Sequence, residues 1–212
     1  SVTGLVTYIP NSAFFGTDSF VYVVCDQYTP NTCDTATVYI IVSPVNDKPI
    51  ALDDTASTLE DNPVAIDVTA NDSDPVDPFG NIDPTTVSVY SGPSNGAVSV
   101  DPVSGVVTYT PAANFYGTDS FYYVVCDDGN PLPALCDSAL VVINVSAVND
   151  QPVAIGDTAS TNEDNPVVVD VPVNDDDPND PLGNIDPTTV TVISGPNNGT
   201  VSIDPVTGAV TY

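Results

Sequence analysis

The sequence predicts an all-β protein made of tandem β-sandwiches of about 100 residues each, and three observations support this fold class. First, the sequence repeats itself, because "KPIALDDTASTLEDNPVAIDV" at 48–68 returns as "QPVAIGDTASTNEDNPVVVDV" at 151–171. Second, the repeated unit consists of short runs rich in Val, Ile and Tyr, which are typical of strands. Third, Gly and Pro separate these runs, and no stretch of useful length has a helical period.

Further matching strings extend the repeat along the whole chain. "TVSVYSGPSNGAVSVDPVSGVVTY" at 86–109 returns at 189–212 with the same offset of 103 residues as the first pair. "TGLVTYIPNSAFFGTDSFVYVVCD" at 3–26 returns at 104–127 with an offset of 101 residues. These offsets predict three segments, namely the C-terminal part of one repeat (1–47), a complete repeat (48–150) and the N-terminal part of the next (151–212). We therefore expect a window of a longer array.

The strand pattern inside the complete repeat is clearest in "FYYVVC" at 121–126, where Phe121, Tyr123 and Val125 alternate with the residues of the opposite face. Similar short runs, such as "PVAIDV", "TVSVYSG" and "ALVVINV", bring the expected number of strands to about seven. About seven strands in about 100 residues predict a Greek-key sandwich of immunoglobulin type. The core Trp and the cysteine spacing of an antibody domain are absent from the sequence.

Composition restricts the possible partners and activities. The chain has 29 acidic residues and one basic residue, Lys48, which gives a formal net charge of −28. Nucleic acids and anionic membrane surfaces need Lys and Arg, so neither is an expected partner. There is no apolar run of about 18 residues, and we expect no membrane-spanning helix. The sequence contains no His and neither a Gly-rich phosphate loop nor a Ser/His/Asp set, so we expect no catalysis.

The four cysteines form two local pairs, Cys25 with Cys33 and Cys126 with Cys136. An even number of cysteines at repeated positions predicts structural disulfides and an oxidising compartment. Neither pair has the CxxC spacing of a redox or zinc motif, so those roles have little support. Each bridge would close a short connection between the last two strands of a repeat.

Two strings resemble a known family of repeats. "VNDKPIALDDTASTLEDNPVAIDVTANDSD" and "GPSNGAVSVDPVSGVVTYTPAANFYGTDSFYYVVCD" resemble the bacterial immunoglobulin-like and cadherin-like tandem repeats of giant cell-surface adhesins. The pattern "VCD…CD" also resembles repeats of the mobile surface adhesins of gliding Bacteroidota. The resemblance implies a secreted, non-enzymatic extender at the bacterial cell surface, often stiffened by calcium. Its partners would be neighbouring repeats of the same chain, and a region outside this segment would bind a surface, glycan or protein.

The acidic residues gather in loops that recur with the repeat, since "ANDSDPVDPFGNIDP" at 70–84 returns as "VNDDDPNDPLGNIDP" at 173–187. Strands alternate direction, so the turn 59–63 and the exit linker are expected at one pole of the sandwich and the loop 70–84 at the other. When repeats stack end to end, the exit pole of one would meet the entry pole of the next. Cadherin-type modules bind Ca²⁺ in this way, with six to eight oxygen ligands. The candidate ligands are Glu60, Asp61, Asn71, Asp72, Asp74, Asp77, Asp119, Asn149, Asp150, Asp157, Glu163, Asp164, Asn174, Asp175, Asp177 and Asp180.

Two other interpretations of the acidic residues stay open. A self-contained site would need only the loop, with Asp72, Asp74 and Asp77 as ligands beside carbonyls near Asn81. Alternatively, Asp and Asn are turn formers and solvated charges with no bound metal.

A second class of function is a ligand-binding adhesive module whose own surface binds a glycan or a protein, with exposed aromatic residues such as Tyr28, Phe79 and Tyr122. The strings Asp–Thr–Ala and Asp–Ser–Ala resemble the O-glycosylation signal of Bacteroidota. The candidate acceptors are Thr35, Thr55, Ser138 and Thr158.

Overall fold

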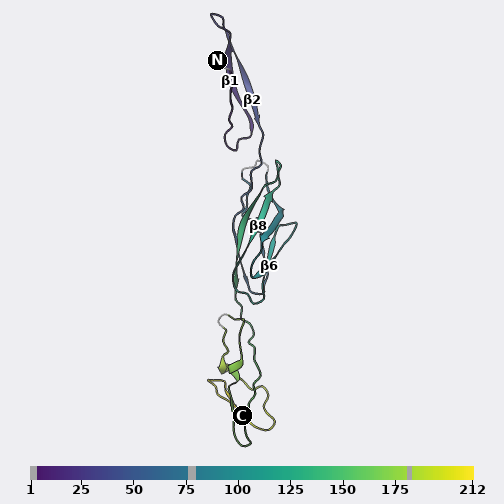
Figure 1. Ribbon diagram of the computed structural model, residues 1–212, viewed down its shortest axis with the longest axis vertical. Helices are drawn as coiled ribbons and strands as arrows, with labels where there is room; N and C mark the ends of the chain where they lie inside the picture. The colour runs from purple at the N-terminus through teal and green to yellow at the C-terminus, as the bar shows by residue number, and fades with distance from the viewer. Residues whose placement is uncertain (1–3, 76–79, 181–182) are drawn as a thin grey trace. The chain divides into compact units, whose positions relative to one another are not determined.

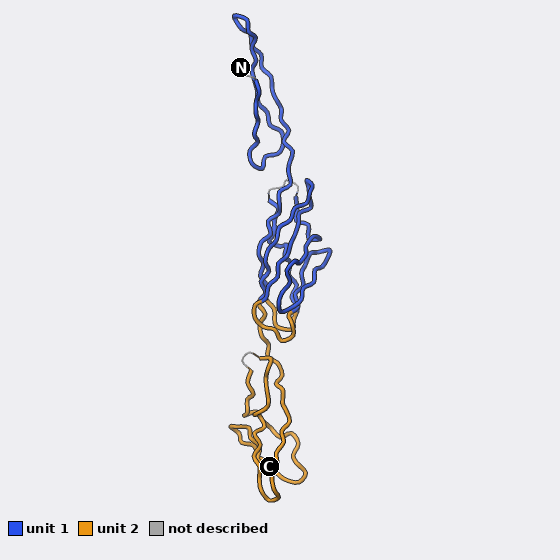
Figure 2. The backbone as a smooth tube through the Cα atoms, viewed as in Figure 1, with its two compact units in different colours: residues 1–56, 63–110, 119–143 blue, residues 57–62, 111–118, 144–212 orange. Residues whose placement is uncertain are grey.

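The computed structural model describes residues 4–75, 80–180 and 183–212, and the chain in it is almost entirely strands and turns. It divides into two compact units (Figure 2). The first contains residues 1–56, 63–110 and 119–143, and the second contains residues 57–62, 111–118 and 144–212. Among the described residues, no helix is long and apolar enough to cross a membrane.

The described part of the predicted complete repeat, 48–75 and 80–150, contains seven strands arranged in two sheets. One sheet has the order β3-β9-β8-β5 and the other the order β4-β7-β6, so strands that follow one another in sequence are often not neighbours in a sheet. This is the crossed connectivity of a Greek-key sandwich, and the predicted fold class is confirmed. The strands are β3 (Asp54–Leu59), β4 (Val64–Ile66), β5 (Ile82–Ser91), β6 (Gly96–Val100), β7 (Val107–Pro111), β8 (Gly117–Asp127) and β9 (Cys136–Ser146).

The core of this sandwich comes from alternate residues of its longest strands. In β8, Phe121, Tyr123 and Val125 are each at most 1% exposed, whereas Tyr122 on the opposite face is 42% exposed. The period-two pattern of a strand with one buried face therefore appears where the sequence predicted it. Buried residues on the other strands complete the core, among them Ile66, Val68, Val87, Val107, Tyr109, Val141 and Ile143.

Residues 4–47 contain a hairpin of two antiparallel strands, β1 (Gly16–Cys25) and β2 (Cys33–Val42), which Figure 1 labels beside the N-terminus. Their register pairs Gly16 with Val42 and Cys25 with Cys33. Most residues of β1 and β2 are exposed to solvent, on both faces of the hairpin.

Residues 151–212 contain less regular structure than the complete repeat. A small sheet has the order β10-β12-β11, where the strands are β10 (Val168–Val169), β11 (Ser202–Ile203) and β12 (Val210–Thr211). Two short 3₁₀ helices, η1 (Val171–Asn174) and η2 (Pro187–Thr189), lie between β10 and β11. Gly208 is the one buried residue among those that the structure describes in this segment, so the segment has little core of its own.

Candidate cation site at the repeat junction

The linker after the complete repeat is fixed to the acidic loop of the next one. Val153 and Asp176 form an isolated antiparallel bridge, with backbone N–H to O distances of 2.8 and 3.1 Å. The N–H of Asp150 donates to both carboxylate oxygens of Asp180, at 3.1 and 3.2 Å. The linker and the loop 173–187 therefore meet within one compact unit.

Carboxylate oxygens in this place lack partners. Oδ2 of Asp150 and Oδ1 of Asp177 are buried and accept no hydrogen bond from any described group. Desolvation, followed by the neighbouring charges of Asp180, Asp150 and Asp176, raises the pKa of the Asp177 carboxyl above its usual range. A Cβ added to Gly183 would lie 2.5 Å from Oδ2 of Asp177, so the backbone of the loop wraps closely around this carboxylate. A buried carboxylate oxygen without a donor favours either protonation of the carboxyl group or a nearby positive charge.

Glu60 supplies another buried carboxylate to the same unit. Its side chain is 2% exposed, Oε1 accepts a short hydrogen bond from the N–H of Val148, and its own N–H donates to Ser146 O at 2.9 Å. Oε2 has no partner among the described residues. Glu163, its counterpart in the next repeat, is exposed instead. Glu60 therefore ties the turn 59–63 to the exit linker.

The preceding junction repeats part of this arrangement in the other unit. Ile50 and Ser73 form the bridge that corresponds to Val153 and Asp176, with N–H to O distances of 2.7 and 3.1 Å. Nδ2 of Asn46 donates to Oδ2 of Asp127 at 2.9 Å and to Pro133 O at 3.0 Å. Asp77, the counterpart of Asp180, lies outside the described residues, as does Phe79.

Other candidate ligands have carboxylates that are already used by the fold. Asp119 accepts the N–H groups of Ser94 and Asn95, at 3.0 and 2.8 Å, and the Tyr109 hydroxyl at 3.0 Å. Because these hydrogen bonds stabilise the charged form, the pKa of Asp119 is lowered in spite of desolvation. Asp61 accepts the N–H of Asn114 at 3.0 Å, and its φ of 58° is the left-handed conformation of the turn.

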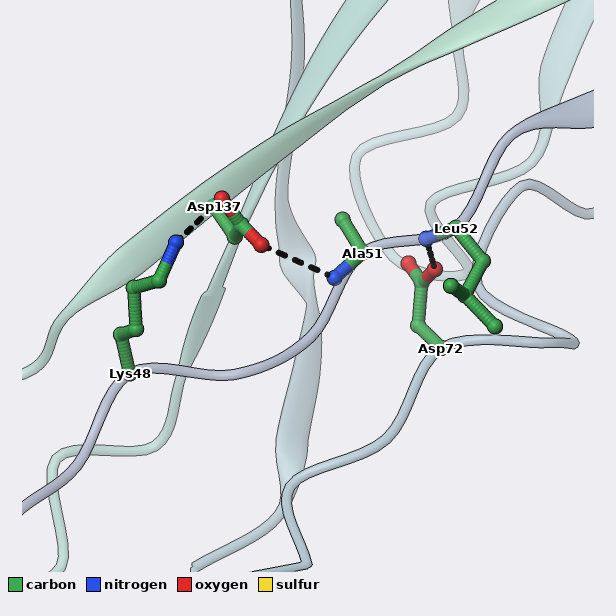
Figure 3. Close-up of polar contacts among 5 residues, drawn as sticks. All are labelled: Lys48, Ala51, Leu52, Asp72 and Asp137. Atoms are coloured by element: carbon green, nitrogen blue, oxygen red, sulfur yellow. Dashed lines mark hydrogen bonds and ion pairs between the residues drawn. The ribbon is translucent and has the colours of Figure 1, made fainter.

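Asp72 has a structural role of the same kind. Figure 3 shows its Oδ1 accepting the N–H of Leu52, at 2.8 Å. The hydroxyl of Tyr123 lies 3.0 Å from both of its oxygens. Asp175 repeats the first contact by accepting the N–H of Ile155 at 2.8 Å. In both repeats this Asp anchors the start of the repeat to its acidic loop.

The remaining candidates take part in fewer contacts. The side-chain amide of Asn71 donates to Asp53 O at 3.1 Å, and that of Asn149 donates to Asp150 O at 3.0 Å. Asp74 is half-buried in the loop 70–84. Three more candidates, Asp157, Asp164 and Asn174, are exposed.

Carboxylate and carbonyl oxygens are the ligands that Ca²⁺ prefers, so the donor chemistry of the junction fits this ion. Among the residues that the structure describes, no three His, Cys, Asp or Glu side chains already stand together as a metal-binding group. The case for a Ca²⁺ site at the junction therefore depends on the buried carboxylate oxygens of Asp150, Asp177 and Glu60 that have no hydrogen-bond partner among the described residues. These three residues and Asp180 are the best supported of the predicted ligands.

The one basic residue of the chain does not neutralise the acidic loop. Lys48 pairs with Asp137 at 2.9 Å, and Asp137 also accepts the N–H of Ala51 at 3.3 Å, as Figure 3 shows. The hydrogen bond from Lys48 is the first cause that lowers the pKa of Asp137. Gln151 replaces Lys48 in the next linker, so this ion pair is not part of the repeating design.

A second group of acidic residues surrounds the phenol of Tyr123. Desolvation and then the charge of Asp72 raise the pKa of Asp54 to about 6. Oδ2 of Asp54 is buried without a hydrogen-bond partner among the described groups. Desolvation and the hydrogen bond to Asp72 raise the pKa of Tyr123 as well. Protonation of Asp54 is therefore favoured by folding.

Both predicted disulfides are present, between Cys25 and Cys33 and between Cys126 and Cys136. Each joins the ends of two consecutive strands, as the sequence predicted. The four candidate acceptors of O-glycosylation, Thr35, Thr55, Ser138 and Thr158, are all exposed.

Sequence reasoning did not include two residues of the junctions among the candidate ligands. Asp47 is the counterpart of Asp150 at an offset of 103 residues, and the recurring "VND" could have identified it. Asp127 is 1% exposed and accepts the N–H groups of Gly129 and Leu135 as well as Asn46. No local pattern distinguishes Asp127 from the other loop aspartates.

The sandwich fold agrees with the comparisons to known proteins. The bacterial Ig domain family matches this chain three times in succession, over residues 1–41, 46–144 and 149–212. The chain belongs to this family. The comparison with curated proteins gave no match.

Solved structures of cadherin repeats are similar to this chain to different degrees. Mouse cadherin-23 repeats EC22–24 are similar with a TM-score of 0.52 and 17% identity, over 96% of this chain and 66% of that one. Protocadherin gamma B7 repeats 1–4 match with a TM-score of 0.47 and 18% identity, over 77% of this chain and 41% of that one. Protocadherin gamma B2 repeats 3–6 match with a TM-score of 0.46 and 20% identity, over 71% of this chain and 37% of that one. The chain thus spans less than half of the protocadherin fragments. The similarity to cadherin-23 shows a shared fold and nothing further.

Proposed function

We propose that this chain is a segment of a long extracellular extender, the stalk of a bacterial surface adhesin or filament, without enzymatic activity and stiffened by Ca²⁺ at its repeat junctions. The contact between the exit linker and the acidic loop of the next repeat carries this proposal, through the hydrogen bonds from Asp150 to Asp180. The match of the bacterial Ig domain family along the chain supports a tandem array divided as 1–47, 48–150 and 151–212. The cysteine pattern supports an adhesin of the gliding-motility type.

The residues at the junction would hold the ion in defined roles. Asp150 belongs to the linker, Asp177 and Asp180 to the following loop, and Glu60 to the turn of the preceding repeat. Ca²⁺ supplies positive charge that offsets the repulsion among these carboxylates and joins segments that are otherwise linked by few hydrogen bonds. The protein's own backbone contributes the N–H of Val148, which orients Glu60, and the N–H of Asp150, which orients Asp180.

The chemistry of the chain suits a mechanical role outside the cell. Two disulfides close hairpins and fit an oxidising compartment. The net charge of −28 would keep neighbouring stalks apart. In this role the partners are neighbouring repeats of the same chain, and adhesion to a surface, glycan or protein belongs to another region.

Thermal unfolding of the full chain tests the calcium proposal. It is measured in excess Ca²⁺, in excess Mg²⁺ and in EDTA at matched ionic strength, so that simple screening is controlled. We expect the transition to rise in Ca²⁺ only, and we expect Asp177→Asn to remove most of this rise. Asp204→Asn is the matched control, because Asp204 is exposed in a turn that asparagine also supports. Identical curves in Ca²⁺ and EDTA for the unchanged chain would refute calcium stiffening.

A second function is favoured by one feature of the surface. Tyr90 and Tyr122 are 60% and 42% exposed, and their rings lie 5.7 Å apart on neighbouring strands β5 and β8. Paired aromatic rings on a sheet provide a stacking surface for a sugar. Glycan-array binding that is lost in Tyr122→Ala would support an adhesive module, whereas an absence of binding would leave the extender as the function.

A further inference from the structure

The loop between the two cysteines of the complete repeat is built around one buried carboxylate. Asp127 follows Cys126 directly and is only 1% exposed. Its Oδ1 accepts the N–H of Gly129 at 2.7 Å, and the N–H of Leu135 lies 3.2 and 3.1 Å from its two carboxylate oxygens. The backbone N–H of Asp127 also donates to Leu135 O at 3.0 Å. This carboxylate therefore joins both ends of the loop 127–135.

The preceding repeat holds its own disulfide loop in the same way. Asp26 is the counterpart of Asp127 and also follows a bridged cysteine directly. It accepts the backbone N–H groups of Tyr28 and Thr32, at 3.0 and 3.2 Å, and these residues occupy the corresponding places in their loop. A carboxylate that organises a loop closed by a disulfide is therefore a repeated feature, although the two loops differ in length.

In the complete repeat, the same carboxylate also binds the linker that enters the sandwich. Nδ2 of Asn46 donates to Oδ2 of Asp127 at 2.9 Å and to Pro133 O at 3.0 Å, and all three residues belong to the first compact unit. Because both partners only accept hydrogen bonds, they fix the orientation of the Asn46 side-chain amide. Asp127 and Pro133 both lie in the loop that the disulfide closes. The loop is therefore the seat of the linker asparagine.

The contact of Asn46 ties the linker to a buried group ahead of the sandwich itself. Pro49 is the next residue of the linker that is buried, and Ile50 then forms a backbone bridge with the acidic loop. Lys48 forms an ion pair, but its side chain is 62% exposed, and exposed pairs contribute little. Without the Asn46 contact, the first buried anchor of the linker would move from Asn46 to Pro49.

We infer that the loop closed by Cys126 and Cys136 is a redox-sensitive seat for the linker, and that a dithiol reductant loosens the linker by opening this loop. Cys136 is exposed and Cys126 is partly covered, so a thiolate of the reductant attacks Sγ of Cys136 and the Cys126 thiolate leaves. The second thiol of the reductant then displaces Cys136 from the mixed disulfide. The reductant becomes a cyclic disulfide, and its two electrons and two protons pass to the cysteine thiols.

Reduction acts on the linker through the two ends of the loop. The bridge joins residues 10 positions apart, and on the chain-entropy model a closure of this size favours the closed loop by up to about a hundredfold. Once it is reduced, the loop opens locally at a lower cost. The N–H of Leu135 then moves away from Asp127, and Pro133 O moves away from Asn46. Neither Asn46 nor Asp127 is a candidate calcium ligand, so this device does not depend on calcium.

The test measures the mobility of the linker by ¹⁵N relaxation NMR of the full chain in EDTA, before and after reduction with dithiothreitol. Cys25→Ser with Cys33→Ser leaves only the bridge between Cys126 and Cys136. In this chain, residues 45–47 should have backbone order parameters of about 0.85 when oxidised and below about 0.6 when reduced. Cys126→Ser with Cys136→Ser leaves only the other bridge and is the matched control. Its linker should be mobile from the start and should not respond to the reductant.

Asn46→Ala tests the contact without redox chemistry. With both disulfides intact, it should lower the order parameters of the linker as far as reduction does. Reduction should then add little, because the two changes remove the same contact. Asn149→Ala is the matched control, since Asn149 is the same residue of the following linker and donates to Asp150 O instead of to a disulfide loop. It should leave residues 45–47 unchanged.

Two results would overturn the inference. One is unchanged order parameters at residues 45–47, either after complete reduction or in Asn46→Ala. The other is loss of the ordered signals of β8 and β9 on reduction, because the bridge would then support the whole sandwich and not the seat of the linker. Since EDTA is present throughout, both results are separate from the outcome of the calcium experiment.

Discussion

Removing the disulfide between Cys126 and Cys136 should destabilise the complete repeat by a predictable amount. The bridge joins residues separated by 10 positions in the sequence. On the chain-entropy model, closing a loop of this size in the unfolded state is worth about 2.7 kcal/mol. For a domain of this size, such a loss corresponds to a fall in melting temperature of roughly 10–20 °C.

The measurement is thermal unfolding of the full chain with both cysteines replaced by serine, followed by circular dichroism. Replacing Cys25 and Cys33 is the matched control, since that bridge lies in the hairpin of β1 and β2 and not in the sandwich. We expect the melting temperature of the main transition to fall when Cys126 and Cys136 are replaced. When Cys25 and Cys33 are replaced, the free energy of unfolding of the sandwich should change by less than about 0.5 kcal/mol. A loss below about 1 kcal/mol for the first pair, or an equal loss for both, would refute the reasoning.

Three further substitutions test the polar network. Glu60→Gln should reduce the rise of the transition in Ca²⁺, whereas Glu163→Gln, at the exposed counterpart, should have a smaller effect; equal effects would contradict a special role for the buried carboxylate. Tyr123→Phe removes the hydroxyl beside Asp72 and should cost about 1.5–3 kcal/mol by denaturant unfolding, whereas Tyr22→Phe in the hairpin should cost nearly nothing. Asp54 has its pKa raised to about 6, so the folded state binds this proton more tightly and stability from this group grows as pH falls through 6 towards 4. Asp54→Asn should accordingly stabilise the chain at pH 7 by about 1 kcal/mol after allowance for solvent screening, with no gain at pH 4, and a gain that is independent of pH would exclude this cause.

The sequence was sufficient to predict the sandwich because several independent patterns agreed. The repeat offsets defined the unit, and the alternation of Phe121, Tyr123 and Val125 identified the buried face of β8. About seven strands were expected, and the described part of 48–150 contains seven. Paired cysteines at the ends of consecutive strands similarly indicated both disulfides.

The candidate site was predicted less completely, for a physical reason. A run such as "NDSDPVD" shows which aspartates share a loop but not which carboxylate oxygens accept backbone N–H groups. Asp119 and Asp72 are of the same residue type as Asp177, yet nearby donors satisfy the first two, whereas Oδ1 of Asp177 accepts no hydrogen bond from a described group. That difference depends on the approach of segments far apart in sequence, such as the linker at Asp150 and the loop at Asp180.

The environment of Lys48 has a consequence for the resistance of the chain to proteases. Lys48 is the only Lys or Arg in 212 residues, and therefore the only residue after which a protease specific for basic side chains could cut. Its ammonium group is paired with Asp137, and the next residue, Pro49, is fully buried, so the peptide bond between them is a poor substrate for such an enzyme. A segment of this composition would therefore outlast trypsin-like digestion that degrades proteins with an ordinary content of Lys and Arg.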